Sequence, residues 1–161
     1  MRYMLRQKMF SLGDKFTIKN EAGGDVFFAK GRIFSLGHKL SFQDMQGAEL
    51  AFIKQKMLTL SATYEISREN GKGAVLRKRI FTLIRDTFDV ALDDGGEWLV
   101  KGSFTDYEYA ISRNDQEIAR ASKRWFTMTD TYGVDIADGE DDVLILACVL
   151  AVDLIHRDRS N

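Results

Sequence analysis

The chain has 161 residues, which suits one domain, and 45% of them are hydrophobic, enough to form a core. Its formal net charge of −1 excludes a strong overall attraction to nucleic acid or to a membrane surface. The single cysteine, Cys148, excludes a disulfide framework and favours a cytoplasmic location, and the charged residues 1–10 are unlike a secretory signal.

The charge is unevenly spread along the chain. Residues 1–60 contain ten Lys or Arg and five Asp or Glu. Residues 101–161 contain seven Lys or Arg and twelve Asp or Glu. Either one end of the molecule is basic, or the two halves interleave and their charges cancel.

A five-residue pattern (basic, apolar, apolar, Ser or Thr, apolar) recurs at intervals of 22 to 24 residues. Its copies are 8–12, 32–36, 56–60, 79–83 and 124–128, with a degenerate copy at 102–106. After each copy comes a segment in which apolar and polar residues alternate, which is typical of a strand with one buried face. These segments are 15–19, 39–43, 63–67, 87–91, 108–112 and 131–136.

Each alternating segment ends in a turn rich in Gly, Asp or Asn, and a longer strand then leads into the next copy. Six pairs of one long and one short strand predict twelve antiparallel strands over about residues 3–136. Proline is absent, although average usage would give about eight. Because proline lacks the amide donor of a paired strand, its absence also favours strands. Chance similarity among amphipathic strands is the alternative explanation of the repeat.

Residues 143–155, VLILACVLAVDLI, contain one charge, Asp153. Acidic residues precede this segment, and His156 and Arg157 follow it, which predicts a helix over about 140–157. Its apolar part is about 20 Å long, too short for a bilayer core of about 30 Å. A helix that is apolar all round must be surrounded. We therefore predict a mainly β fold, with a twelve-stranded antiparallel closed barrel around a central buried C-terminal helix, as one domain over residues 1–161.

The stretch 123–136, KRWFTMTDTYGVDI, with the acidic turn and apolar helix after it, resembles the LURP-one-related family of the tubby C-terminal-like superfamily. Phospholipid scramblases share the pattern more distantly, at Asp130, Tyr132, Gly133, Val134 and Ala147-Cys148. The resemblance implies the same barrel around a helix. Tubby proteins bind phosphoinositides through basic barrel residues, but members of the LURP-one-related family generally lack a defined biochemical activity.

No catalytic set is visible in the sequence. His38 falls at a predicted hairpin and His156 at the end of the predicted helix. Each is expected to be solvated or to have a capping role. No nucleophile elbow or phosphate-binding loop is present, and Cys148 is expected to be a small buried hydrophobe. The chain is therefore predicted not to be an enzyme; an enzyme with an unrecognised site is the third hypothesis.

Basic residues on the predicted strands are the first binding candidates. Residues two apart in a strand share a face, so the basic residues of neighbouring strands would form a band for anionic head groups. The candidates are Lys15, Lys19, Lys39, Lys30, Arg32, Lys54 and Lys56. The alternative is ordinary cross-strand pairing with the acidic residues of the short strands, Glu65, Asp89, Glu108 and Asp135. Lys15, Lys19 and Lys39 have no such counterparts nearby in the sequence.

Acidic residues before the helix are the second candidates. Asp130, Asp135 and Asp138 could contribute oxygen ligands to Ca²⁺, the ion that scramblases are thought to bind in the matching region. Helix N-termini attract acidic residues anyway, so capping is the alternative. No other cofactor is expected.

The sequence thus predicts a non-enzymatic cytoplasmic binding module, peripheral at a membrane, that recognises phospholipid or phosphoinositide head groups. The alternative is a structural or protein–protein interaction domain with internally paired charges. The expected partner is accordingly an anionic lipid head group or a protein, and not a nucleic acid.

Overall fold

The structure, a computed structural model, describes residues 1–10, 13–31, 36–81, 85–103, 106–124 and 131–158, without the side chains of 7–10, 13–14 and 158. It contains twelve strands and one helix, α1 (Asp142–Asp158). The strands are β1 (Arg2–Phe10), β2 (Gly13–Lys19), β3 (Asp25–Gly31), β4 (Lys39–Asp44), β5 (Glu49–Gln55), β6 (Thr63–Ser67), β7 (Ala74–Lys78), β8 (Asp86–Leu92), β9 (Glu97–Ser103), β10 (Glu108–Arg113), β11 (Gln116–Ser122) and β12 (Thr131–Ile136).

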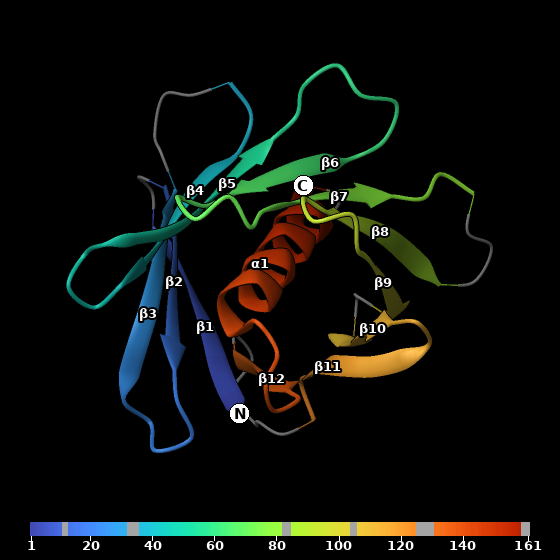
Figure 1. Ribbon diagram of the computed structural model, residues 1–161. Helices are drawn as coiled ribbons and strands as arrows, with labels where there is room; N and C mark the ends of the chain where they lie inside the picture. Colours follow the sequence, from blue (N-terminus) through green and yellow to red (C-terminus); the bar gives the residue numbers. More distant parts are fainter. Residues whose placement is uncertain (11–12, 32–35, 82–84, 104–105, 125–130, 159–161) are drawn as a thin grey trace.

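The strands form one closed antiparallel barrel in which every strand pairs with its neighbours in the chain (Figure 1). The barrel closes where β1 pairs with β12, with Arg2 opposite Asp135 and Arg6 opposite Thr131. Closure leaves no unpaired edge strand. The predicted fold is confirmed, and each of the six predicted alternating segments lies within an even-numbered strand.

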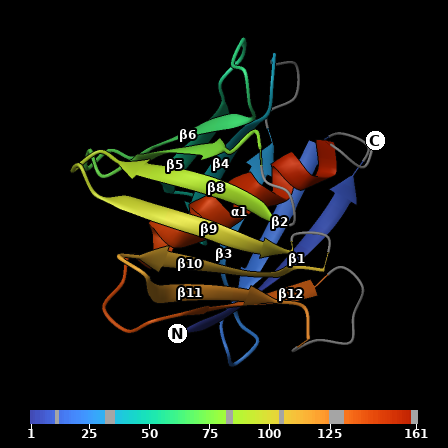
Figure 2. The ribbon, with the colours of Figure 1, turned by 90° about the vertical axis from the view of Figure 1, so that its right-hand side faces the viewer.

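Helix α1 runs through the middle of the barrel, behind β8 and β9 in the view of Figure 2. All residues from Leu144 to Ile155 are buried. Inward-facing side chains such as Phe16 and Ile53 surround the helix and are themselves fully buried. An all-round apolar helix is stable here because the wall covers every side of it. No helix in the described ranges has the length and apolarity needed to cross a bilayer.

Asp153 is the charged residue within the apolar run, and it is only 3% exposed. Arg157, one helical turn later, places its Nε 3.9 Å from Asp153 Oδ2 and its guanidinium over the Phe16 ring. Burial, and next the charge of Asp153, hold the pKa values of Tyr109 and Tyr132 well above their usual range. The C-terminal turn of the helix therefore brings a charged pair, Asp153 and Arg157, to the inside of the barrel.

The up-and-down order gives the barrel two unlike ends. At the turn end, where even-numbered strands finish and odd-numbered strands begin, short turns such as 45–48 and 93–96 connect the strands. Gly47 and Gly95 have φ of +89° there, a conformation that glycine adopts without steric cost. At the loop end, odd-numbered strands finish and even-numbered strands begin, and most connections are longer.

The recurring pattern lies mainly in loop-end connections, which corrects the prediction of long strands running through it. β5 ends at Gln55 and β7 at Lys78, so the copies 56–60 and 79–83 follow these strands. Their apolar side chains have no place in the barrel wall and are exposed at Met57, Leu58 and Phe81. Copies 32–36 and 124–128 lie mostly outside the described residues.

The degenerate copy starts at Gly102, where β9 lies unusually close to β10. A Cβ on Gly102 would lie 2.3 Å from the carbonyl oxygen of Glu108 and 2.4 Å from the Cα of Tyr109. Because backbone atoms of a paired strand cannot yield locally, no larger residue fits at this position.

Candidate functional site

Four of the predicted lysines lie together on the outer wall near the loop end: Lys15, Lys30, Lys39 and Lys54. We call them the lysine face. Lys15 on β2 is the cross-strand partner of Lys30 on β3. Lys39 on β4 is the partner of Lys54 on β5. The two pairs are neighbours, since Lys30 is opposite Ser41, two residues from Lys39.

The lysines point outward because the residues next to them in the sequence point inward. Phe16, Ala29, Leu40 and Ile53 are at most 1% exposed, and successive side chains of a strand alternate between its faces. Lys15, Lys30 and Lys54 are exposed and Lys39 is half-buried. The alternation of the strands thus places four ammonium groups on one surface.

Within the described part of the chain, no acidic side chain forms an ion pair with any lysine of this face. Directly opposite positions bring Cβ atoms to about 5 Å, where like charges destabilise a sheet. The Lys30 ammonium lies 4.9 Å from the Phe28 ring centroid. The acidic residue closest by register is Glu65 on β6, directly opposite Lys54, and its carboxylate lies 3.3 Å from Lys56 Nζ. The four ammonium groups of the lysine face therefore have no ion-pair partner among the described residues, although Glu65 borders the face.

The other predicted basic residues are placed differently. Lys19 is at the turn end of β2, where its Nζ lies 2.5 Å from the Asp25 carboxylate, so this lysine does have an acidic partner nearby in the sequence. Lys56 Nζ lies 3.3 Å from Glu65 Oε2. Arg32 lies outside the described residues. The structure therefore separates the lysine face from two paired lysines.

Each of the four acidic residues named as pairing candidates has a basic neighbour, as the pairing alternative predicts. The pairs are Glu65 with Lys56, Asp89 with Arg79, Glu108 with Arg124 and Asp135 with Arg2. Arg79 donates two hydrogen bonds to Asp89, of 2.7 and 2.8 Å, and this contact holds the pKa of Asp89 below its usual range. Pairing thus neutralises part of the basic band.

The predicted metal ligands do not converge in the described structure. Asp135 lies 3.4 Å from an Arg2 guanidinium nitrogen, Asp138 is fully exposed and 3.8 Å from the N-terminal ammonium, and Asp130 lies outside the described residues. Across the described ranges, no three His, Cys, Asp or Glu side chains are grouped so that they could hold an ion.

The acidic residues at the helix start have structural contacts instead. Asp141 Oδ1 accepts a hydrogen bond of 3.1 Å from the amide of Leu144, as an N-terminal cap does. Its Oδ2 accepts one of 2.6 Å from Arg68, and Glu140 accepts two from Arg113. These contacts attach the helix start to the barrel wall.

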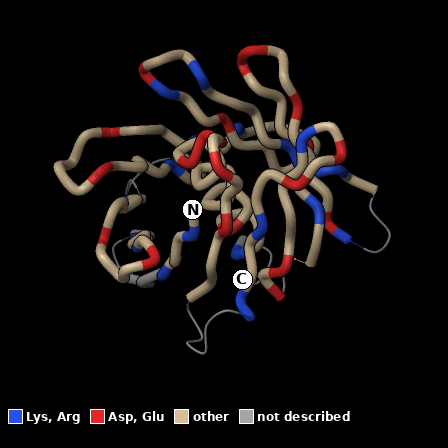
Figure 3. The backbone as a smooth tube through the Cα atoms, turned by 60° about the horizontal axis from the view of Figure 1, so that its bottom comes forward, with Lys and Arg blue, Asp and Glu red and all other residues tan. Residues whose placement is uncertain are grey.

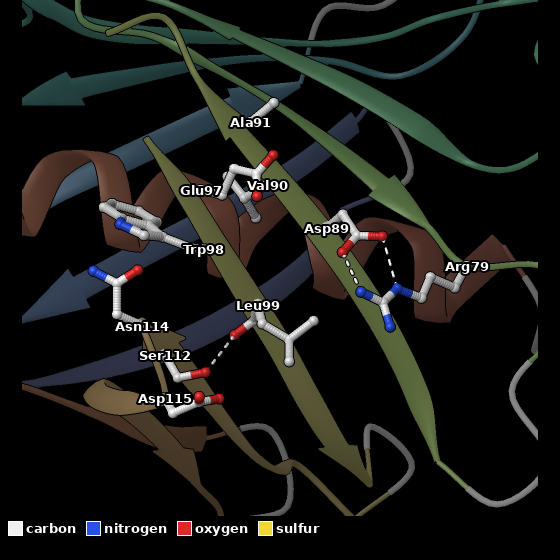
Figure 4. Close-up of a pocket in the computed structure, with 10 residues that line it drawn as sticks. All are labelled: Arg79, Asp89, Val90, Ala91, Glu97, Trp98, Leu99, Ser112, Asn114 and Asp115. Atoms are coloured by element: carbon white, nitrogen blue, oxygen red, sulfur yellow. Dashed lines mark hydrogen bonds and ion pairs between the residues drawn. The ribbon is translucent and has the colours of Figure 1, made fainter. Parts of the chain in front are cut away.

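A groove of about 290 Å³ crosses the outer wall over β8, β9 and β10 (Figure 4). The Arg79–Asp89 pair lies on one side, and Ser112 on the other donates to the Leu99 carbonyl at 3.4 Å. None of the ten residues that line it is a His or Cys. Ser112 therefore has no His beside it in the groove, and its hydroxyl donates to a backbone carbonyl rather than to one of the carboxylates that line the groove.

A second groove, of about 650 Å³, lies at the loop end and was not foreseen from the sequence. We call it the arginine groove. Its lining residues are Arg85, Ser103, Asp106, Glu108, Arg120, Lys123 and Arg124. Arg120 is held by Glu117 through two hydrogen bonds, and Lys123 lies over the Tyr107 ring. Arg120, Lys123 and Arg124 are close in the sequence, but Arg85 and the two carboxylates come from other segments, so no local sequence pattern predicts the groove.

The two ends of the barrel differ in charge: the turn end is mainly acidic and the loop end mainly basic. Acidic residues mark several turn-end hairpins (Figure 3), and those at or beside this end are Glu21, Asp25, Asp44, Glu49, Glu69, Asp93, Asp94, Glu97, Asp115, Glu117, Asp138 and Glu140. The basic residues at or beside the loop end are Lys15, Lys30, Lys39, Lys54, Lys56, Arg77, Lys78, Arg79, Arg85, Lys101, Lys123 and Arg124, against the acidic Asp86, Asp106 and Glu108. Fewer basic residues lie at the turn end: Arg2, Lys19, Arg68, Lys72 and Arg113. The loop end is therefore the more basic end of the barrel, and residues from both the basic and the acidic parts of the sequence contribute to it.

The remaining candidate nucleophile and bases lie apart from both grooves. Cys148 is fully buried in α1, and burial raises its pKa to about 12, so the thiol stays protonated at neutral pH. The amide of His38 donates to the Gln55 side chain, and the His156 ring packs edge-on against Tyr107.

Residues 1–153 match the family model described as LURP-one-related. The chain is 30% identical over 151 residues to "Uncharacterized protein YxjI" of Bacillus subtilis (strain 168), covering 94% of this chain and 91% of that protein. An X-ray structure of a protein from Arabidopsis thaliana has a TM-score of 0.66 at 16% identity and covers 96% of this chain and 91% of its own. That likeness supports the fold alone. With its family match over nearly the whole length, the chain belongs to the LURP-one-related family.

Proposed function

We propose that the barrel is a non-enzymatic module that binds the anionic head groups of phospholipids through the lysine face. The observation that carries the proposal is the placement of Lys15, Lys30, Lys39 and Lys54 on adjacent strands without an ion pair in the described structure. Glu65, the residue opposite Lys54, pairs with Lys56 instead. Placing like charges opposite one another costs stability. A bound phosphate group would relieve that repulsion and accept hydrogen bonds from the ammonium groups.

Lysines near an anionic membrane surface contribute about 1 kcal/mol each, so four of them suffice for weak, salt-sensitive binding. The sequence resemblance to tubby-like proteins supports the same ligand class. Catalysis is not part of the proposal, because the Cys148 thiol is buried and protonated and neither of the two grooves is lined by a His or Cys. The proposed location is the cytoplasmic surface of a membrane.

Co-sedimentation with vesicles tests the proposal. The wild-type chain is expected to bind vesicles that contain phosphatidylserine or a phosphoinositide at low ionic strength, and to release them as salt rises because salt screens the attraction. The variant with Lys15→Glu, Lys30→Glu, Lys39→Glu and Lys54→Glu should lose this binding. Lys72→Glu, which changes an exposed lysine at the turn end, should bind almost as wild type does and is the matched control. Failure of the wild type to bind at low ionic strength would remove the proposal.

A protein-interaction domain is the second candidate. The pairing of Lys56 with Glu65 and of Arg79 with Asp89 favours it, because these contacts use part of the basic band internally. This function predicts no vesicle binding at any ionic strength. It also predicts a specific protein partner that the lysine-face variant retains as well as wild type does.

A further inference from the structure

Large apolar side chains are exposed at the loop end of the barrel. Those in its connections are Leu36 (86% exposed), Met57 (55%), Leu58 (104%), Leu60 (98%), Ile80 (58%) and Phe81 (95%). They come from the β3–β4, β5–β6 and β7–β8 connections, which are successive on the same rim. Exposed apolar groups gathered in one place mark an interaction surface more often than scattered ones do.

The β5–β6 connection holds its leucines outward at a conformational cost. Leu58 has a φ of +60°, in the left-handed region that glycine and asparagine adopt more readily than a bulky residue. The Thr59 hydroxyl donates to the carbonyls of Lys56 and Ser61, at 3.3 and 2.8 Å, and so ties the turn together. A leucine that is both strained and fully exposed stabilises nothing within the barrel, which points to a role outside it.

The charges around these exposed apolar side chains, which we call the apolar tips, indicate what kind of surface the loop end binds. Lys39 and Lys54 of the lysine face lie at the base of the β3–β4 and β5–β6 connections, and Arg85 of the arginine groove lies at the base of the β7–β8 connection. The acidic turn end lies at the far side of the barrel. Apolar tips ringed by cations match a bilayer with anionic head groups, where cations stay at head-group level while apolar side chains enter the interface.

We propose that the loop end docks on an anionic bilayer, with Leu58, Leu60 and Phe81 entering the interfacial region while the lysine face and the arginine groove contact head groups. This inference rests on the proposed function and adds the orientation of the barrel. It also names the source of the anionic group, a lipid surface rather than a free phosphate. The acidic turn end then faces away from the membrane, where an anionic surface does not repel it.

The first test uses substitutions that leave the core intact. Leu58→Ser with Leu60→Ser should weaken binding to phosphatidylserine vesicles about tenfold or more, because two exposed leucines no longer leave water on binding. Met45→Ser, which changes a half-exposed methionine at the turn end, should bind as wild type does. Inorganic phosphate should compete poorly with vesicles. Equal vesicle affinity of the leucine variant and wild type would overturn the inference.

A second test reports orientation directly. Leu60→Trp should show a blue-shifted emission on adding the vesicles and quenching by brominated lipid, whereas Met45→Trp should show neither. If wild type binds with salt sensitivity but Leu60→Trp is not quenched, the proposed function stands and the docking inference fails. If wild type binds no anionic vesicle, both fail. If phosphate displaces the protein at millimolar concentration, a soluble ligand replaces the bilayer and the inference also fails.

Discussion

The Tyr3 hydroxyl donates a hydrogen bond of 2.5 Å to the Asp142 carboxylate, which joins the first strand of the barrel to the first turn of the central helix. The two residues are 139 positions apart, so this bond forms only when the barrel has closed around the helix. Burial and the Asp142 carboxylate together raise the pKa of Tyr3, which therefore remains a donor at all ordinary pH values. The contact shows how the start of α1 is held in register with the wall.

Removing this hydroxyl should destabilise the fold. We expect Tyr3→Phe to lower the free energy of unfolding by about 1–3 kcal/mol, because a carboxylate loses a charge-assisted hydrogen bond. The matched control is Tyr132→Phe, since the buried Tyr132 hydroxyl has no hydrogen-bond partner among the described residues. That change should be neutral or stabilising. Urea unfolding of both variants measures the difference, and equal losses would contradict the role given to Tyr3.

Leucines of the helix and of the loop end should differ sharply in their effect on stability. Leu146 is fully buried in α1, and Leu146→Ala is expected to cost about 2–5 kcal/mol because it leaves a cavity beneath the wall. Leu60 is 98% exposed, and Leu60→Ala should change stability by no more than about 0.5 kcal/mol. Thermal and urea unfolding give both values. A large loss at Leu60 would mean that the leucine packs within the fold and is not free to contact a membrane.

Stability at alkaline pH should depend on Cys148. Its thiol has a pKa of about 12 when folded and about 8.5 when unfolded, so between these values the folded state binds the extra proton. Stability from this group is therefore complete below about pH 8.5 and is lost progressively as pH rises towards 12. Wild type should lose stability relative to Cys148→Ala over this window. Comparing urea midpoints of the two proteins at pH 8 and pH 11 cancels the contribution of the buried tyrosines.

The same thiol offers a second measurement. A thiol reagent should not modify folded wild-type protein at pH 8, and it should react fully in denaturing urea, because the reagent needs both access and a thiolate. Modification of the folded protein at a rate near that of the unfolded chain would show that the helix leaves its barrel readily.

The barrel and the helix at its centre could be predicted from local patterns in the sequence. A segment that is apolar on every side, from Val143 onward, must be enclosed, and six alternating segments at regular spacing provide the wall that encloses it. These properties are local and periodic, so they can be recognised without knowing which strands meet. The family resemblance, carried by residues 123–136, rested on the same kind of local pattern.

The arrangement of charge on the barrel could not be predicted in the same way, because it depends on contacts between distant parts of the chain. Lys19 and Lys15 lie on the same strand four residues apart, yet one meets Asp25 at the turn end and the other faces Lys30 near the loop end. That outcome depends on cross-strand register and on which end of the barrel a residue reaches. The recurring five-residue pattern likewise resembled the sequence of a strand. It lies in exposed connections because β5 and β7 end just before it. Register and strand ends are long-range properties, which is why the basic end, the arginine groove and the apolar tips emerged only from the folded chain.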